Sequence, residues 1–124
     1  MRVFAAGELP RFESTRDSRS RLDLVTENVP VGAKRLRADR IVYHPGDSAA
    51  RHYHVGADQL FVVFEGDGVY VLEGERRPVR AGDTAIAPAG QVHSFENESE
   101  ADFVFVEFWA PLPEDTVWID TGDI

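Results

Sequence analysis

Short hydrophobic runs, several of them alternating with polar residues, recur about every ten residues along this chain. The segment KRLRADRIVYH at 34–44 alternates with a period of two, and QLFVVF at 59–64 and FVFVEFW at 103–109 are rich in β-branched and aromatic residues. Successive side chains of a β-strand point to opposite faces, so this pattern predicts strands with one face turned to a core. No longer window shows the apolar spacing of an amphipathic helix. We therefore expect an all-β protein.

Turns rich in glycine, proline and acidic residues separate these runs. The expected strands are 21–26, 34–44, 51–54, 59–64, the two arms of a hairpin within 68–79, and then 84–88, 92–97 and 103–109. Strands this short, joined by glycine turns, are typical of a barrel or sandwich. The chain is thereby divided into a polar N-terminal arm (1–20), a β-barrel (21–112) and an extended, proline-broken C-terminal tail (113–124).

Composition and charge narrow the class of protein. The 124 residues suffice for one hydrophobic core, and the lack of cysteine excludes disulfides and zinc–thiolate sites. A formal net charge of −9 repels a phosphate backbone, so we expect no nucleic-acid partner. No apolar run is long enough for a secretion signal or a membrane span. We therefore expect a cytoplasmic protein that does not bind a membrane.

Two of the four histidines lie in one glycine-bounded segment. Five residues separate Gly46 from His52, one separates His52 from His54, four separate His54 from Gln59, and six separate Gln59 from Gly66. On a strand, His52 and His54 share a face with backbones roughly 7 Å apart, so their imidazoles can converge on one metal ion. The alternative is a pair of ordinary hydrogen-bonded histidines.

A third histidine lies in a second segment with its own spacing. Five residues separate Gly82 from Pro88, one separates Pro88 from Gly90, two separate Gly90 from His93, and three separate His93 from Asn97. The glycines, Pro88 and Asn97 are interpreted as turn and packing residues.

Together the two segments resemble the two sequence motifs of the cupin superfamily. The segment GDTAIAPAGQVHSFEN matches the second motif in full, and GDSAARHYHVGADQLFVVFEG departs from the first only where Gln59 replaces a glutamate. The resemblance implies a double-stranded β-helix, a jelly-roll-like barrel, with a divalent transition metal (Fe, Mn, Co, Ni or Zn) at its centre. It implies a homodimer as well. Carried over residue by residue, the metal ligands would be His52, His54, Gln59 and His93.

Glutamine at the third ligand position raises two questions. The first is which residue binds: Asp58 is a rival, but it leaves seven residues before Gly66 and faces away from Gln59. The second is what a neutral ligand changes. Three imidazoles and an amide leave a divalent ion with its full charge. The ion is therefore expected to be a stronger Lewis acid and to resist oxidation. This favours polarisation of an oxygen substrate, such as a hydroxy or keto acid.

Several other residues are candidates for contact with a substrate. Phe61 and Val63, on the face of Gln59, and Phe95, on the face of His93, are expected to line the barrel interior, either as substrate contacts or as core. Arg40 could bind a substrate carboxylate if its face of the strand points inward, and is otherwise a surface arginine.

Three residues are candidates for proton transfer. Glu107 shares strand parity with aromatic residues, so it is either a general base of raised pKa or the partner of a nearby arginine. Tyr43 and His44 precede a proline-glycine turn and either move protons or lie at the rim.

Three functions are consistent with these residues. The first is a metal-dependent enzyme, an isomerase or lyase, that isomerises, ring-opens or dehydrates a small hydroxy acid, keto acid, sugar acid or polyketide-like substrate. The second is an Fe(II)-dependent dioxygenase. The third is a small-molecule sensor whose metal is structural.

Overall fold

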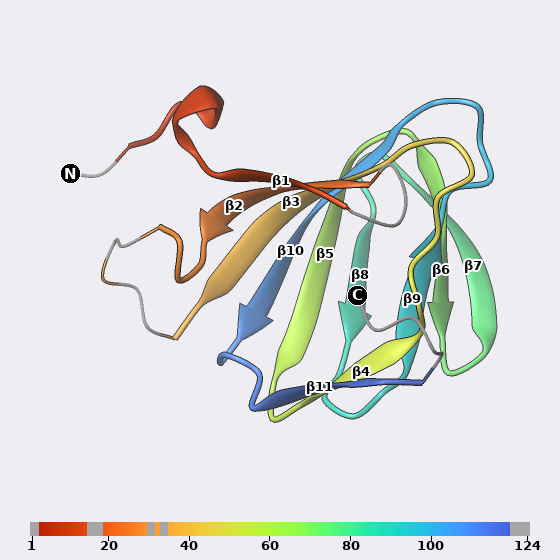
Figure 1. Cartoon of the computed structure of the whole chain (residues 1–124). Helices are drawn as coiled ribbons and strands as arrows, with labels where there is room; N and C mark the ends of the chain where they lie inside the picture. Colours follow the sequence, from red (N-terminus) through yellow and green to blue (C-terminus); the bar gives the residue numbers. More distant parts are fainter. Residues whose placement is uncertain (1–2, 15–18, 30–31, 33–34, 120–124) are drawn as a thin grey trace.

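Two antiparallel β-sheets form the body of the protein (Figure 1). The computed structural model describes residues 3–14, 19–29, 32 and 35–119. One sheet has the order β1-β2-β3-β10-β5-β8 and the other the order β11-β4-β9-β6-β7. The elements are η1 (Ala6–Glu8), β1 (Arg11–Glu13), β2 (Ser20–Val25), β3 (Arg37–Tyr43), β4 (His52–Val55), β5 (Asp58–Glu65), β6 (Asp67–Leu72), β7 (Glu75–Arg80), β8 (Thr84–Ala87), β9 (His93–Glu96), β10 (Phe103–Ala110) and β11 (Asp115–Trp118).

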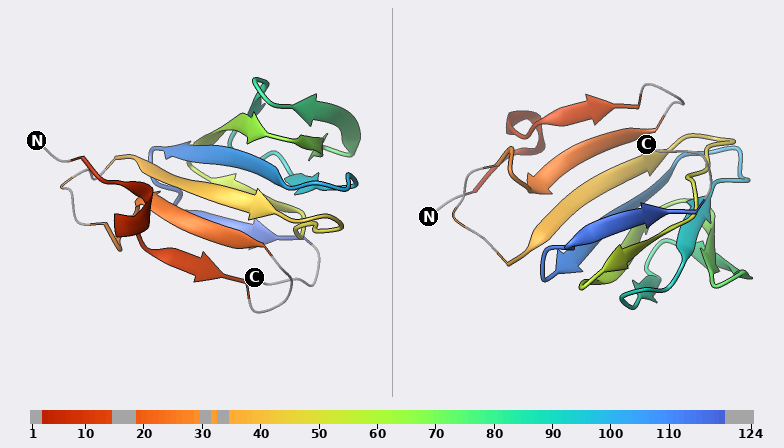
Figure 2. Two further views of the ribbon diagram at one scale, coloured as in Figure 1. Left: turned by 90° about the horizontal axis from the view of Figure 1, so that it is seen from above. Right: turned by 60° about the horizontal axis from the view of Figure 1, so that its bottom comes forward.

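The predicted all-β barrel is confirmed, because nine expected segments coincide with β2 to β10. Among the described residues the only helical segment is the three-residue turn η1, and nothing helical there is long or apolar enough to cross a membrane. Strands also occur outside the expected barrel boundaries: β1 pairs with β2, and β11 pairs with β4. Figure 2 shows that β1 and β2 lie at one edge of the longer sheet, away from β6 and β7.

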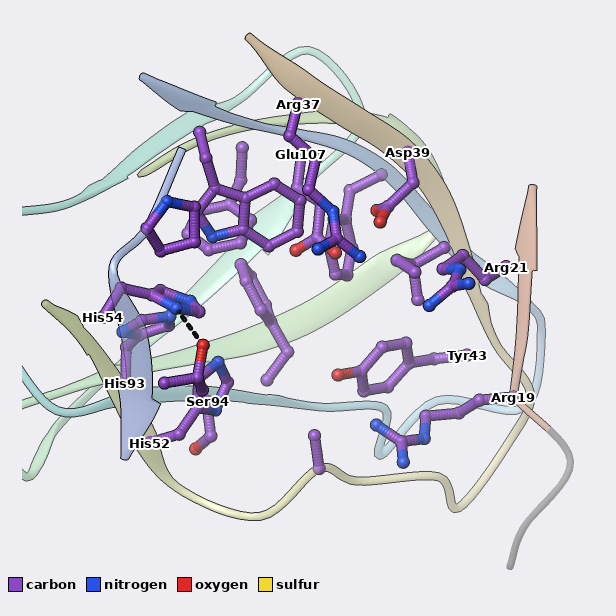
Figure 3. A pocket seen from close by; sticks show the side chains of 18 of the residues that line it. Arg19, Arg21, Arg37, Asp39, Tyr43, His52, His54, His93, Ser94 and Glu107 are labelled. Carbon is purple, nitrogen blue, oxygen red and sulfur yellow. Dashed lines mark hydrogen bonds between the residues drawn. The ribbon is translucent and has the colours of Figure 1, made fainter. Parts of the chain in front are cut away.

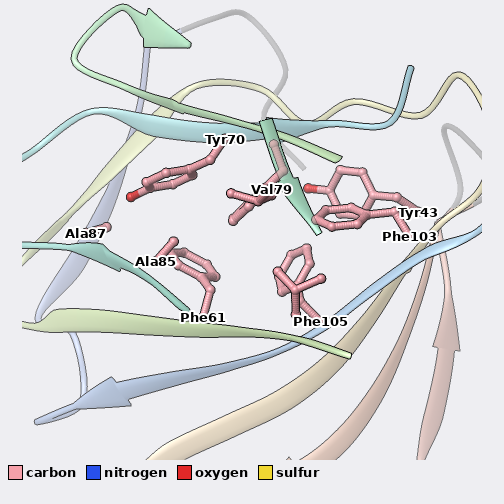
Figure 4. Packing of buried hydrophobic residues seen from close by; sticks show 10 residues of the cluster. Tyr43, Phe61, Tyr70, Val79, Ala85, Ala87, Phe103 and Phe105 are labelled. Carbon is pink, nitrogen blue, oxygen red and sulfur yellow. The ribbon is translucent and has the colours of Figure 1, made fainter. Parts of the chain in front are cut away.

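Aromatic side chains from both sheets fill the space between them (Figure 4). Phe105 of β10 stacks on Phe95 of β9 with ring centroids 4.6 Å apart, and Phe61 of β5 meets Phe95 edge-on at 4.8 Å. Each fully buried phenylalanine contributes about 1.5–3 kcal/mol, and each aromatic pair roughly 0.5–1.5 kcal/mol more. These contacts join the two sheets, and the same phenylalanines border the polar residues described below.

The register of β3 against β10 decides which residues point inward. Phe103 pairs with Tyr43, Phe105 with Ile41 and Glu107 with Asp39, and all six side chains share the inner face. Arg40 pairs with Val106 and therefore lies on the outer face.

The turn between β5 and β6 requires a glycine for two independent reasons. Gly66 has φ of +79°, and a Cβ there would lie 2.1 Å from the backbone oxygen of Asp102. Gly74, in the next hairpin, has nearly the same φ of +81° but open space around it. Comparing Gly66 with Gly74 therefore distinguishes the energetic cost of a left-handed backbone from the cost of the steric contact.

We predict that Gly66→Ala destabilises the protein more than Gly74→Ala. A left-handed alanine lowers the free energy of unfolding of both variants by about 1 kcal/mol. Only Gly66→Ala also forces a backbone carbonyl to move, which lowers it by about 2 kcal/mol more. Urea unfolding followed by circular dichroism measures both. Equal losses of stability would show that the close approach to Asp102 has no energetic weight.

Candidate metal centre

Three histidines from two neighbouring strands converge inside the barrel. His52 and His54 share a face of β4, and His93 of β9 is the cross-strand partner of His52. The ring centroid of His52 lies 5.0 Å from that of His54 and 4.4 Å from that of His93. One ligand nitrogen from each ring lies within 4.8 Å of the other two. This is the arrangement expected of imidazoles that bind one ion.

Hydrogen bonds on the outer edge of each ring fix its orientation. Nδ1 of His52 lies 3.0 Å from the carbonyl oxygen of Ala50, and Nδ1 of His93 lies 3.0 Å from that of Gln91. A carbonyl only accepts, so both Nδ1 atoms carry the proton and both Nε2 atoms present a lone pair. Nδ1 of His54 pairs with Oγ1 of Thr116 at 2.9 Å. Partners of this kind on the far nitrogen are typical of metal-binding histidines.

The three rings are neutral at physiological pH. Burial, reinforced by the other imidazoles, lowers the pKa of His54 to about 3 and that of His93 to about 4, and burial lowers the pKa of His52 as well. Nε2 of His54 is buried and has no hydrogen-bond partner among the described residues. A buried ring nitrogen without a hydrogen-bond partner is costly unless a ligand such as a cation occupies the site.

The side chain of Gln59 reaches the histidines from β5. It is 2% exposed, its Oε1 lies 2.9 Å from Nε2 of His93, and its Nε2 donates to Oε2 of Glu107 at 2.8 Å. Oε1 and the Nε2 of neutral His93 are both acceptors, so their close approach is favourable only with a cation beside them. The residues present therefore fit a divalent metal. The rival Asp58 is exposed and accepts a hydrogen bond from the backbone N–H of Ala89.

Glu107 and Asp39 form a buried carboxyl pair behind Gln59. They are cross-strand partners on β10 and β3, and their side chains are hydrogen bonded to each other. Burial raises the pKa of Asp39, and burial together with the neighbouring Asp39 raises the pKa of Glu107 well above its ordinary value. Two carboxyls this close share a proton, and Glu107 donates it to Asp39. That leaves Oε2 of Glu107 to accept from the amide of Gln59.

A cavity of about 310 Å³ opens beside the histidines. Figure 3 shows the three rings on one side of the cavity and Arg19, Arg21, Tyr43 and Asp39 on the opposite side. Arg37 and Glu107 lie along the upper edge of the view, between the two sides. A volume of this size admits a small organic molecule.

Comparison with known proteins gives the family. The family described as "Cupin domain" matches residues 39–109, more than half of the chain. The chain belongs to the cupin family. The resemblance of its two motifs to those of cupins is thus confirmed.

Two related proteins and one solved structure show what the chain is similar to. The cupin is 33% identical over 67 residues to an oxalate-binding protein of Thermotoga maritima, covering 54% of this chain and 55% of that protein. It is 29% identical over 105 residues to the polyketide synthase CurC of Streptomyces cyaneus, covering 85% and 68%. The solved polyketide cyclase RemF of Streptomyces resistomycificus shares the fold, with a TM-score of 0.82 at 19% identity, covering 99% and 88%. The match to the first of these spans about half of that relative's length.

The cupin brings together some of the residues singled out from the sequence and separates others. Tyr43, Phe61, Phe95 and Glu107 line the cavity. The remaining three do not: Val63 is packed in the aromatic core, His44 bonds the exposed Asp102 at 2.7 Å, and Arg40 lies on the outer face of β3. Glu107 is hydrogen bonded to Gln59 and Asp39, whereas the sequence left an arginine partner open.

Sequence reasoning missed several residues of the cavity. Asp39 and Arg37 share the parity of Tyr43, which could have signalled an inward face. Thr116 and Trp118 gave no such signal, because they reach the histidines only through the pairing of β11 with β4. The indole of Trp118 lies 4.5 Å from the ring of His52.

We predict that Thr116→Val weakens metal binding by about tenfold, because His54 loses the partner that orients it. Competition calorimetry with zinc and a chelator measures the affinity. The control Thr84→Val makes the same change at an exposed position of β8 and is expected to bind zinc like the unmodified protein. Unchanged affinity in Thr116→Val would contradict a role for this contact.

Proposed function

We propose that this cupin is a metal-dependent enzyme that isomerises, ring-opens or dehydrates a small oxygenated substrate. The metal would be held by His52, His54, His93 and the Oε1 of Gln59. The observation that carries the proposal is the neutrality of this ligand set, with three unprotonated imidazoles lining one cavity and the amide oxygen of Gln59 against His93. When bound, a divalent metal supplies Lewis-acid polarisation of a substrate hydroxyl or carbonyl oxygen.

The chain's own residues supply the proton chemistry. Glu107 and Asp39 line the cavity next to Gln59 and share a proton. A carboxyl whose pKa is raised can exchange that proton with the substrate near neutral pH. Tyr43 lines the same cavity, and its hydroxyl is a second group that can exchange a proton with a substrate. His44 lies outside the cavity. Phe61 and Phe95 form an apolar wall that limits access of water.

The relatives support the kind of substrate. One is named for binding oxalate and another for polyketide synthesis, and the molecules in both names are rich in oxygen. Substrates of this chemistry can present a hydroxyl or carbonyl to a Lewis acid. The homodimer and the cytoplasmic location stay predictions from the sequence.

We predict turnover without oxygen and with zinc. The protein, stripped of metal and loaded separately with Zn, Mn, Co, Ni or Fe(II), is screened under nitrogen against hydroxy acids, keto acids, sugar acids and polyketones, with products followed by mass spectrometry. Turnover that requires both Fe(II) and oxygen would instead establish the dioxygenase. Tight binding without turnover would establish the sensor.

We predict that Gln59→Glu costs stability and that Glu107→Gln restores it. The single variant places two carboxyls where an amide N–H met a carboxyl oxygen, and a buried acceptor left without its donor costs roughly 1–3 kcal/mol. The double variant exchanges the two groups and recovers the hydrogen bond in the opposite sense. Chemical unfolding of both variants measures this recovery.

The double variant, Gln59→Glu with Glu107→Gln, also tests the role of the neutral ligand. In the double variant a carboxylate reaches the metal, so turnover is expected to fall by about tenfold or more although zinc is retained. Activity that stays the same or rises would overturn the account of Gln59.

A further inference from the structure

A second cavity lies between the free edges of the two sheets. β7 ends the shorter sheet and β8 ends the longer one, and each pairs with only one other strand of the described chain. The cavity between them has a volume of about 360 Å³, slightly larger than the cavity beside the histidines. Among the described residues, none lines both cavities. The barrel therefore holds a separate space of the size that small ligands occupy.

Most of the lining of this second cavity is apolar. Side chains from β6, β7 and β8 contribute to it, namely Tyr70, Leu72, Val79, Ala85 and Ile86. Figure 4 shows Tyr70 and Val79 on one side of the space between the sheets and Ala85 on the other, and all three are buried. The hydroxyl of Tyr70 donates a hydrogen bond of 2.8 Å to the backbone oxygen of Ile86, which joins the two sheets. These residues form a fixed floor that offers apolar contact to a ligand.

Two side chains of opposite charge lie on the inner face of β7. Glu75 pairs in register with Leu72 and Arg77 pairs with Tyr70, so both share the face that lines the cavity. Their backbones lie roughly 7 Å apart, because they are two positions apart on one strand. Both side chains are exposed, and neither has a hydrogen bond or an ion pair within the described chain. A free carboxylate and a free guanidinium thus lie side by side at the mouth of the cavity.

The outer face of the same strand differs. Arg76 is hydrogen bonded to the carboxylates of Glu96 and Glu98. Inward-pointing charges on an edge strand discourage its pairing with another sheet. Charge of either sign serves that role, and no cavity is needed for it. Opposite charges left free of each other beside an apolar floor therefore indicate a ligand that carries both charges.

The other side of the cavity adds two hydrogen-bond acceptors. Asp83 and Thr84 line it where β8 begins. One carboxylate oxygen of Asp83 accepts from the backbone N–H of Arg80, and the hydroxyl of Thr84 has no hydrogen bond within the described chain. An ammonium group donates three hydrogen bonds, which the carboxylates of Glu75 and Asp83 and this hydroxyl can accept. Arg77 is the cationic group of the lining.

We propose that this cavity binds a free α-amino acid with an apolar side chain. Arg77 holds the carboxylate through the two parallel hydrogen bonds that a planar guanidinium can donate. Glu75, with Asp83 and Thr84, accepts from the ammonium group, and the apolar side chain lies against the floor. An amino acid carries both charges on one carbon atom, which matches opposite charges two residues apart on one strand. The site goes beyond the proposed function and lies outside its cavity.

Calorimetry with four probes tests the site. Leucine carries both charges and an apolar side chain, whereas 4-methylpentanoate lacks the ammonium group, 3-methylbutylamine lacks the carboxylate and glycine lacks the side chain. The unmodified protein is expected to bind leucine at least about fivefold more tightly than each of the other three, because each has lost one set of contacts. No measurable binding of leucine, or equal binding of leucine and any other probe, would overturn the proposal.

Substitutions on the two faces of β7 locate the binding. Arg77→Gln is expected to bind leucine no more tightly than 3-methylbutylamine, and Glu75→Gln no more tightly than 4-methylpentanoate. The matched variant Arg76→Gln removes the same charge from the outer face and is expected to keep the affinity for leucine. Circular dichroism checks folding, and if one inner-face variant does not fold, the other decides. A preference for leucine that survives these inner-face substitutions would overturn the proposal.

The outcome is independent of the metal centre. Neither Glu75 nor Arg77 lines the cavity beside the histidines. Failure to bind zinc, or failure to turn over any substrate, would leave the preference for leucine intact, and leucine bound by a metal at the histidines would be insensitive to Arg77→Gln. Conversely, an enzyme that works with zinc but shows no preference for leucine retains its proposed function and loses this inference.

Discussion

The amide of Gln59 connects two groups with opposite requirements. On one side is the unprotonated Nε2 of His93, which needs a positive partner, and on the other is Glu107, which needs a donor. An amide satisfies Glu107 with its N–H and turns its oxygen toward the histidines. A carboxylate at this position would offer no hydrogen to Glu107, so the glutamine is what satisfies this buried acceptor.

The hydrogen bond from Gln59 to Glu107 places a site for positive charge next to a carboxyl pair that holds a proton. The neutral imidazoles and amide leave the positive charge of a bound ion undiminished, while the carboxyl pair beside them keeps its proton. The low dielectric that raises the pKa of the carboxyls also lowers the pKa of the histidines, so one physical cause prepares both groups. In the proposed function, Lewis-acid polarisation and proton transfer would act on adjacent atoms of one substrate.

The site draws on segments spread between Arg19 and Trp118. Arginines come from the start of β2 and from β3, histidines from β4 and β9, the amide from β5, and Thr116 and Trp118 from β11. Antiparallel pairing brings these distant strands to one cavity. The aromatic core, which borders the cavity, holds the sheets in the register that this convergence requires.

The sequence by itself determined the strands from β2 to β10, the family, and the shared face of His52 and His54. A period of two is a local property, so it placed His52 and His54 on one face, and glycine spacing placed the turns. Alternation defines two faces of a strand but not which one meets the core, which is why Arg40 was selected and Arg37 was not. Only the tertiary structure decided that choice, together with the contact of Thr116 with His54, because both depend on the pairing and register of strands remote in the chain.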